Sequence, residues 1–287
     1  MPEVTPETVA ITPALVIAST LEIALLIAGL VVLWRVRFSP AARSALETSY
    51  RPLGAWRLLP SDFLAATLFV IFGGLGFQFA VGFIGRGIPA LTADPDLWLI
   101  LQGIAFQLGM LGGAIGGTFY TRSRGNVMPG GDPLKVPLPK AGFLTFLAVL
   151  PVVTAVSLLW TGVLQLAGID AQRQELVDLF VNAESRTTAI VMASFAVLVA
   201  PITEELIFRA GLFRYLRTRI PRWAAFVLPA MLFASLHGNL AAFAPLTALG
   251  IVFAVAYEHT GRIAVPMIAH ALFNLNTILL LLTGVTV

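Results

Sequence analysis

Long runs of uncharged apolar residues constrain this chain more than any other feature of its sequence. A helix needs about 20 such residues to cross the hydrocarbon core of a bilayer. Charged residues make up only 11% of the chain and the mean hydropathy is +0.90, whereas about a quarter of the residues of a soluble domain are charged. The sequence therefore predicts an all-α, polytopic transmembrane bundle of about eight helices. The apolar runs lie near residues 12–34, 63–84, 97–119, 142–166, 188–210, 223–239, 240–257 and 263–285.

The basic residues predict how this bundle is oriented. If the N-terminus faces outward, 14 of the 18 Lys and Arg residues lie in inward-facing loops, whereas Arg86, Arg173 and Arg186 face outward. The positive-inside rule then places both termini outside a prokaryotic cell membrane. The same rule accounts for the net charge of +3, so no nucleic-acid partner is expected. The chain has no cysteine, which excludes disulfides, thiol nucleophiles and Cys-ligated metal centres.

The connections between the apolar runs suggest a division of the chain. The segment Leu46–Pro60 combines aromatic, leucine and arginine residues, and we expect it to lie along the inner membrane interface. The Gly- and Pro-rich loop Asn126–Pro139 is a hinge candidate. It separates N-terminal helices with their cytoplasmic loops (1–140) from a C-terminal core (141–287). Glycines four residues apart in the third run indicate close helix packing.

Ionisable residues inside apolar runs are costly and indicate a functional site. Most of those found here lie in the last third of the chain, and the exception, Glu22, receives no assignment from the sequence. The set is Glu22, Glu204, Glu205, Arg209, His237 and His270, with Asn274 as a neutral companion.

The two adjacent glutamates are predicted to have different partners. Residues four apart share a helix face, so Arg209 is placed to pair with Glu205. Glu204 then points elsewhere and has no obvious partner in its own helix. A structural ion pair needs only one glutamate, so Glu204 is the candidate for chemistry.

Distances along the chain predict that Glu204 and His237 meet. Glu204 lies 17 residues before Pro221 and His237 lies 16 after it. In antiparallel helices both would lie roughly 24–26 Å from the turn. His270 and Asn274 share one face of the last run, and they can join the same polar pocket.

This set of residues has the parts for amide hydrolysis. A carboxylate can act as a general base on water, with a histidine holding that water or moving its proton. A second histidine and an asparagine can donate hydrogen bonds to the developing oxyanion. The sequence excludes other types of intramembrane protease. A metalloprotease of the His-Glu-xx-His type is excluded because no histidine is followed by glutamate. A serine protease is excluded because no serine is placed beside a histidine as nucleophile, and an aspartyl protease because no aspartate lies inside a span.

Three motifs resemble those of the CAAX-processing and bacteriocin-processing (CPBP) intramembrane proteases, which include the type II prenyl endopeptidases. They are Glu204-Glu205-xxx-Arg209, Phe233-xxx-His237 and His270-xxx-Asn274, all within residues 188–287. The resemblance implies that Glu204 and His237 activate water and that His270 and Asn274 stabilise the oxyanion. Arg209 would hold Glu205, and Phe233 would pack or form a wall of the pocket.

The resemblance implies a hydrolase that cleaves membrane-anchored proteins or peptides, prenylated CAAX-type substrates included, from the cytoplasmic side. No cofactor is expected. The metal-dependent alternative would place zinc on Glu204, His237 and His270, because catalytic zinc takes three protein ligands. Two further alternatives are a non-catalytic regulator or immunity protein of the same family and a proton-coupled transporter. The residues indicate no oligomeric state.

Overall fold

The computed structural model describes residues 12–40, 44, 53–127, 136–169, 180 and 185–283, and throughout these ranges the regular structure is helical. The predicted all-α membrane bundle is therefore confirmed. Among the described residues, seven helices are long and apolar enough to cross a membrane, and an eighth apolar helix is shorter. The single-segment spans are α1 (Pro13–Phe38), α3 (Pro60–Gly85), α5 (Pro95–Ser123), α6 (Leu138–Leu166), α12 (Leu240–Thr260) and α13 (Ala264–Leu282).

The remaining long span changes its helical type along its length. It runs from Arg186 to Leu216 and includes two π-helical stretches, which are often found at functional sites. Its parts are α8 (Arg186–Ser194), η1 (Phe195–Val199), α9 (Ala200–Glu204), η2 (Glu205–Phe213) and α10 (Arg214–Leu216).

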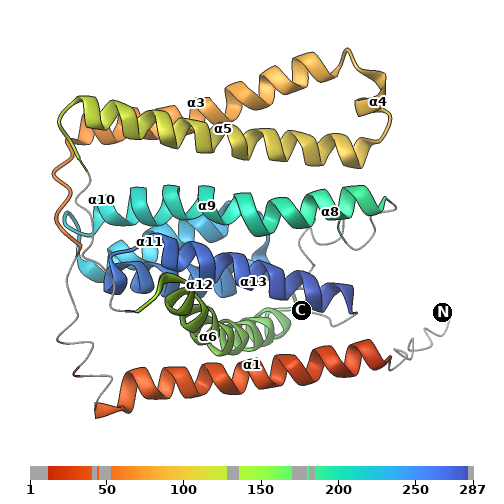
Figure 1. Ribbon diagram of the computed structural model, residues 1–287, viewed down its shortest axis with the longest axis vertical. Helices are drawn as coiled ribbons and strands as arrows, with labels where there is room; N and C mark the ends of the chain where they lie inside the picture. The colour runs from red at the N-terminus through yellow and green to blue at the C-terminus, as the bar shows by residue number, and fades with distance from the viewer. Residues whose placement is uncertain are drawn as a thin grey trace.

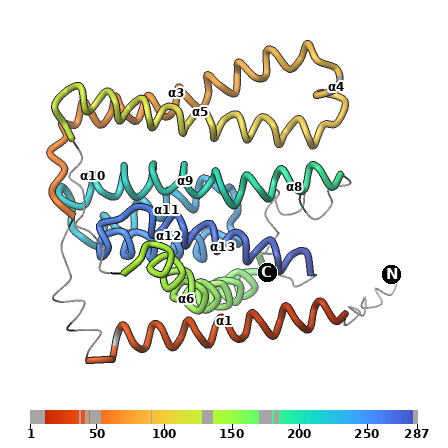
Figure 2. The backbone as a smooth tube through the Cα atoms, in the orientation of Figure 1, coloured from red at the N-terminus to blue at the C-terminus, as the bar shows by residue number. Residues whose placement is uncertain are grey.

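The helices lie side by side in one bundle (Figures 1 and 2). The pair α3 and α5, joined through α4 (Pro89–Thr92), forms a hairpin along one side, next to the α8–α10 span. On the other side α1 packs against α6, which packs against α12 and α13. The core residues come from α6, η2, α11 (Arg222–Ser235), α12 and α13, and include Val149, Phe208, Phe233 and Phe253. These five elements hold the C-terminal half together by close van der Waals packing, because lipid chains are as apolar as the side chains.

The sixth predicted span, residues 223–239, is shorter than expected. α11 has 14 residues and ends at Ser235, which corresponds to about 21 Å. The chain then turns at Gly238, whose φ of 64° favours glycine, and α12 begins after Asn239. The Asn239 side-chain oxygen accepts a hydrogen bond from the Ala242 amide at 2.8 Å and so caps α12. His237 therefore lies in a tight turn between two helices.

The predicted close packing of the third run is confirmed. A methyl group at Gly113 would overlap the backbone oxygen of Phe69 in α3, and one at Gly109 would overlap that of Gly73. The two backbones can approach this closely only because these positions lack a side chain. The α3–α5 hairpin is therefore a tightly packed unit.

The segment Leu46–Pro60, predicted to lie along the inner membrane interface, is described from Leu53 onward. Residues 53–59 form no helix, and Leu53, Trp56 and Leu58 are buried. Arg219 donates hydrogen bonds to the carbonyl oxygens of Trp56 and Leu58, and Arg217 donates one to Leu53. These hydrogen bonds from Arg217 and Arg219 hold the segment against the end of the bundle. Residues 46–52, and residues 128–135 of the hinge candidate, lie outside the described ranges.

Candidate active site

The predicted pairing of Glu205 with Arg209 is confirmed. Arg209 Nη1 lies 2.9 Å from Glu205 Oε1, and the side chains are 2% and 0% exposed. The guanidinium lies over the ring of Phe233 at 4.6 Å and over that of Phe253 at 5.4 Å. Gly250 of α12 makes room for it, because a methyl group there would lie 3.2 Å from Arg209 Nη2. The pair is thus neutralised and enclosed within the bundle.

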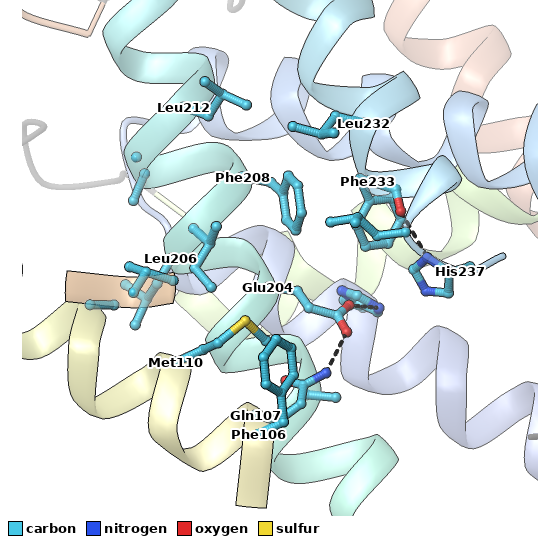
Figure 3. Close-up of a pocket in the computed structure, with 18 of the residues that line it drawn as sticks. Phe106, Gln107, Met110, Glu204, Leu206, Phe208, Leu212, Leu232, Phe233 and His237 are labelled. Carbon is cyan, nitrogen blue, oxygen red and sulfur yellow. Dashed lines mark hydrogen bonds and ion pairs between the residues drawn. The ribbon is translucent and has the colours of Figure 1, made fainter. Parts of the chain in front are cut away.

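Glu204 is not part of this pair and lies at the wall of a cavity. Its Oε1 accepts a hydrogen bond from Gln107 Nε2 at 3.1 Å, and its Oε2 lies 3.6 Å from His270 Nε2. The side chain is 14% exposed. Figure 3 shows it reaching from α9 toward Gln107 of α5. Glu204 therefore has no Arg or Lys partner among the described residues and remains accessible from the cavity.

His270 lies between the two glutamates. Its Nδ1 is 2.9 Å from Glu205 Oε1, and its Nε2 faces Glu204. Because the Glu205 carboxylate accepts a hydrogen bond, it orients the ring with Nδ1 as the donor. The sequence predicted that His270 joins the pocket of Glu204 but not that it contacts Glu205, which it reaches across from α13 to η2.

His237 lines the same cavity from the turn after α11. Its Nδ1 lies 2.8 Å from the Phe233 carbonyl oxygen, which can only accept a hydrogen bond. In its neutral form the ring then carries its proton on Nδ1 and leaves Nε2 as an acceptor. The Phe233 ring contacts the imidazole edge to face, with centroids 4.7 Å apart. No direct hydrogen bond joins His237 to Glu204 in the described structure, so a molecule between them would have to connect the two.

Asn274 is held by a carbonyl group that a proline leaves free. In η1 an N–H group bonds to the carbonyl group five residues earlier, so Ala200 N–H bonds to the Phe195 carbonyl oxygen. The next bond of this kind would join the N–H of residue 201 to the Ala196 carbonyl oxygen, but residue 201 is a proline. Proline has no N–H to donate. Asn274 Nδ2 supplies the missing donor at 2.7 Å. One of its two N–H bonds is thereby used, and the other remains for a second acceptor.

The cavity has a volume of about 1670 Å³. The hairpin forms one wall, and η2, α11 and α13 form the other. Most of its lining residues are apolar, and it extends from Glu204 to Arg122 and Asn126 near the end of α5. The polar groups around Glu204 share this space, among them His237, His270 and Asn274. A long apolar substrate with one polar bond to be cleaved would fit this distribution.

A catalytic metal ion needs about three protein ligands close together. In the part of the chain that the structure describes, no group of three or more His, Asp or Glu side chains is placed to hold a metal ion. In particular, Glu204, His237 and His270 do not form such a group.

Sequence reasoning missed Gln107. It lies on α5, outside the three motifs, and as an uncharged residue it was not counted among the ionisable groups. An amide inside an apolar run was the available signal, because amides in membranes commonly form hydrogen bonds between helices.

The comparisons with known proteins agree with the motif resemblance. Residues 186–276 match the family model described as type II CAAX prenyl endopeptidase Rce1-like. A Bacillus subtilis (strain 168) protein that carries the name membrane peptidase YdiL is 34% identical over 88 residues, covering 31% of this chain and 36% of that protein. The membrane-embedded CAAX protease MroQ of Staphylococcus aureus (strain USA300) is 33% identical over 86 residues, covering 28% of this chain and 35% of that protein.

The aligned region spans little more than a third of the length of these curated relatives. No solved structure matches the chain. The family match contains all seven residues predicted from the motifs, whereas Gln107 lies outside it. The resemblance to the type II CAAX endopeptidases is thus confirmed for the C-terminal third of this multi-pass membrane protein.

Proposed function

We propose that this chain is an intramembrane endopeptidase that hydrolyses peptide bonds of membrane-anchored proteins or peptides. The observation that carries the proposal is the separation of two adjacent glutamates. Glu205 is neutralised by Arg209, whereas Glu204 faces an apolar cavity beside His270. The similarity of residues 186–276 to a prenyl endopeptidase family supports the same reaction.

In the proposed reaction Glu204 is the general base. It takes a proton from a water molecule, whose oxygen attacks the carbonyl carbon of the scissile bond. The resulting oxyanion collapses and the carbon–nitrogen bond breaks. The proton held by Glu204 passes to the leaving nitrogen, so the products are a carboxylate and an amine. His237 Nε2, the acceptor nitrogen of the neutral ring, would accept a hydrogen bond from the second O–H of the water and take that proton when the carboxylic acid product ionises to the carboxylate.

The oxyanion would be stabilised from α13. Asn274 has one N–H bond left after its contact with Ala196. His270 can donate from Nε2 when its ring carries both protons, because Glu205 accepts from Nδ1. Hydrogen-bond donors that are oriented before the reaction stabilise the oxyanion more strongly in a site that excludes water than they would in water. The mechanism uses no metal ion.

The apolar cavity supports a lipid-modified substrate, and prenylated CAAX-type peptides are the specific class that we propose. Its basic end, near Arg122, supports entry from the cytoplasmic side. We further propose residues 141–287 as the protease core, with residues 1–140 supplying the opposite wall of the cavity.

The test is mass spectrometry of a peptide library incubated with the purified protein in lipid. The library contains prenylated and unprenylated C-terminal peptides. We expect Glu204→Gln to lower cleavage by at least about 100-fold, as for loss of a general base. Glu22→Gln is the matched control, because Glu22 is also an intramembrane glutamate but lies on α1 outside the cavity lining. It should cleave at the wild-type rate.

A second arm adds a chelator. Unchanged cleavage is expected, and loss of cleavage would assign a metal to Glu204, His237 and His270. Full activity of Glu204→Gln would refute the proposed base. If no peptide is cleaved at all, the non-catalytic regulator or the proton-coupled transporter becomes the better account. Flux measured in proteoliposomes with and without a pH gradient would separate those two.

A further inference from the structure

The contact between Gln107 and Glu204 joins the two halves of the chain. Gln107 lies on α5, 97 residues before Glu204, and its Nε2 donates to Glu204 Oε1 at 3.1 Å. Both residues line the large cavity (Figure 3). Gln107 lies outside residues 186–276, so similarity to the family model assigns it no role.

The other polar atom of the Gln107 amide, its oxygen, makes no contact that would hold the side chain beside Glu204. Its Oε1 is buried and has no hydrogen-bond partner within the described structure. A buried polar atom without a partner is unfavourable. The bond to Glu204 is therefore the one polar contact that favours this position of the amide.

The contact also orients the Glu204 carboxylate. Oε1 accepts the Gln107 N–H, and Oε2 faces His270 Nε2. These two groups lie on different helices, and the hydrogen bond from Gln107 restricts rotation of the carboxylate about its last bond. Oε2 is then the oxygen available to take a proton from water.

We propose that Gln107 is a positioning residue that holds the Glu204 carboxylate in its reactive orientation from across the cavity. This inference rests on the proposed endopeptidase function. It makes the α3–α5 hairpin a part of the active site as well as a wall beside it. Any displacement of α5 relative to α9 would then change the orientation of the base.

The kinetic test compares two glutamines on the same helix. Gln107→Leu removes the amide while keeping an apolar side chain of similar size. We expect kcat to fall by about 10–100-fold, a magnitude typical of partners that orient a reacting group, with KM changed by less than about threefold. Gln102→Leu is the matched control, because Gln102 lies against Gly82 of α3 and does not line the cavity. It should leave kcat unchanged.

A double-mutant cycle separates positioning from a general packing effect. If Gln107 acts through Glu204, Gln107→Leu should cause no further loss in the Glu204→Gln background. Equal, additive losses in both backgrounds would overturn the proposal, as would an unchanged kcat in the single variant.

An infrared measurement tests the contact without relying on cleavage. The difference between wild type and Glu204→Gln identifies the carboxylate band of Glu204. That band should shift in Gln107→Leu and stay in place in Gln102→Leu. An unshifted band overturns the proposal whatever the activity is. A shifted band in a protein that cleaves no peptide would instead refute the proposed function, and with it the positioning role in hydrolysis.

Discussion

At the scale of single residues, two adjacent glutamates have opposite environments. Side chains of neighbouring helical residues diverge by about 100°. Glu205 therefore enters the protein interior, where Arg209 and His270 contact it, and Glu204 faces the cavity. A buried ion pair costs desolvation, which is offset only where further hydrogen bonds satisfy its charges. Here His270 supplies such a contact, since its Nδ1 lies 2.9 Å from Glu205 Oε1.

The first prediction concerns this pair. Arg209→Met should leave the Glu205 charge buried without its cation and lower the free energy of unfolding by about 3–5 kcal/mol. The measurement is thermal unfolding in detergent. Arg124→Met is the control, since Arg124 is 57% exposed and lies 3.5 Å from Asp62. Asp62 is buried, but it also accepts hydrogen bonds from Tyr120 and Asn126, so the loss of the exposed Arg124 charge should cost no more than about 1 kcal/mol.

The double variant Glu205→Gln, Arg209→Met distinguishes the effect of an unpaired buried charge from the effect of losing the Arg209 side chain. Removing both charges should recover part of the lost stability, because no unpaired charge is left in the interior. Equal unfolding temperatures for wild type and Arg209→Met would contradict the prediction.

At the scale of elements, helix irregularity and helix packing position the site. The π-helical η1 and Pro201 leave the Ala196 carbonyl oxygen without a backbone donor, and Asn274 of α13 donates a hydrogen bond to it. On the opposite wall, α5 lies against α3 through glycines with no room for a side chain. The position of Gln107 on α5 therefore depends on the close packing of the hairpin.

The second prediction tests that packing with two glycines of the same helix. Gly113→Ala adds a methyl group where the backbone oxygen of Phe69 lies, whereas a methyl group at Gly112 meets nothing within 4 Å. Overpacking should make Gly113→Ala less stable by about 1–3 kcal/mol. Gly112→Ala should be neutral or gain up to about 1 kcal/mol from helix propensity.

Unfolding temperatures in the same detergent provide the comparison. Because both substitutions have the same effect on helix propensity, their difference isolates the contact with α3. Indistinguishable unfolding temperatures for the two variants would show that the hairpin can separate without cost.

At the scale of the whole molecule, polar contacts fasten the ends and the outer helices. Asn276 Nδ2 donates to Glu22 Oε2 at 2.9 Å, which joins α13 to α1 and supplies the partner of the remaining intramembrane glutamate. At one end of the bundle Glu258 is buried and pairs with Arg217 at 3.1 Å and Arg222 at 2.7 Å. α1 begins and α13 ends at the opposite end (Figure 1).

The third prediction concerns orientation in the membrane. The native chain has no cysteine, so single cysteines can be placed at either end without background. Ser123→Cys lies at the end of α5 near the basic residues, and Thr92→Cys lies at the end of α4 on the other side; both positions are exposed. The positive-inside rule predicts that the basic end faces the cytoplasm.

An impermeant maleimide applied to intact cells should therefore label Thr92→Cys at once and Ser123→Cys only after permeabilisation. Denaturation before labelling controls for cysteines that the fold shields. The reverse pattern would place the cavity mouth near Arg122 outside the cell and invert the proposed route of substrate entry.

The sequence by itself determined the features that depend on a single helix. The length of an apolar run sets which segments can span a bilayer, and helical periodicity sets which residues share a face. The membrane bundle and the Glu205–Arg209 pair follow from these two facts. The start of α12 at Leu240 agrees with the predicted boundary, but the end of α11 at Ser235 lies four residues before the predicted end of the sixth run. The positive φ of Gly238 and the Asn239 cap make the turn between the two helices.

Only the tertiary structure decided which side chains contact one another across helices. The contacts of Gln107 with Glu204, of His270 with Glu205 and of Asn276 with Glu22 all join distant segments. Such contacts depend on how each helix is rotated and on how closely two backbones approach. Those quantities result from packing over the whole bundle, since lipid chains are as apolar as the side chains and favour no particular neighbour. For that reason the motifs predicted the residues of the site, and the fold added the helix that faces them.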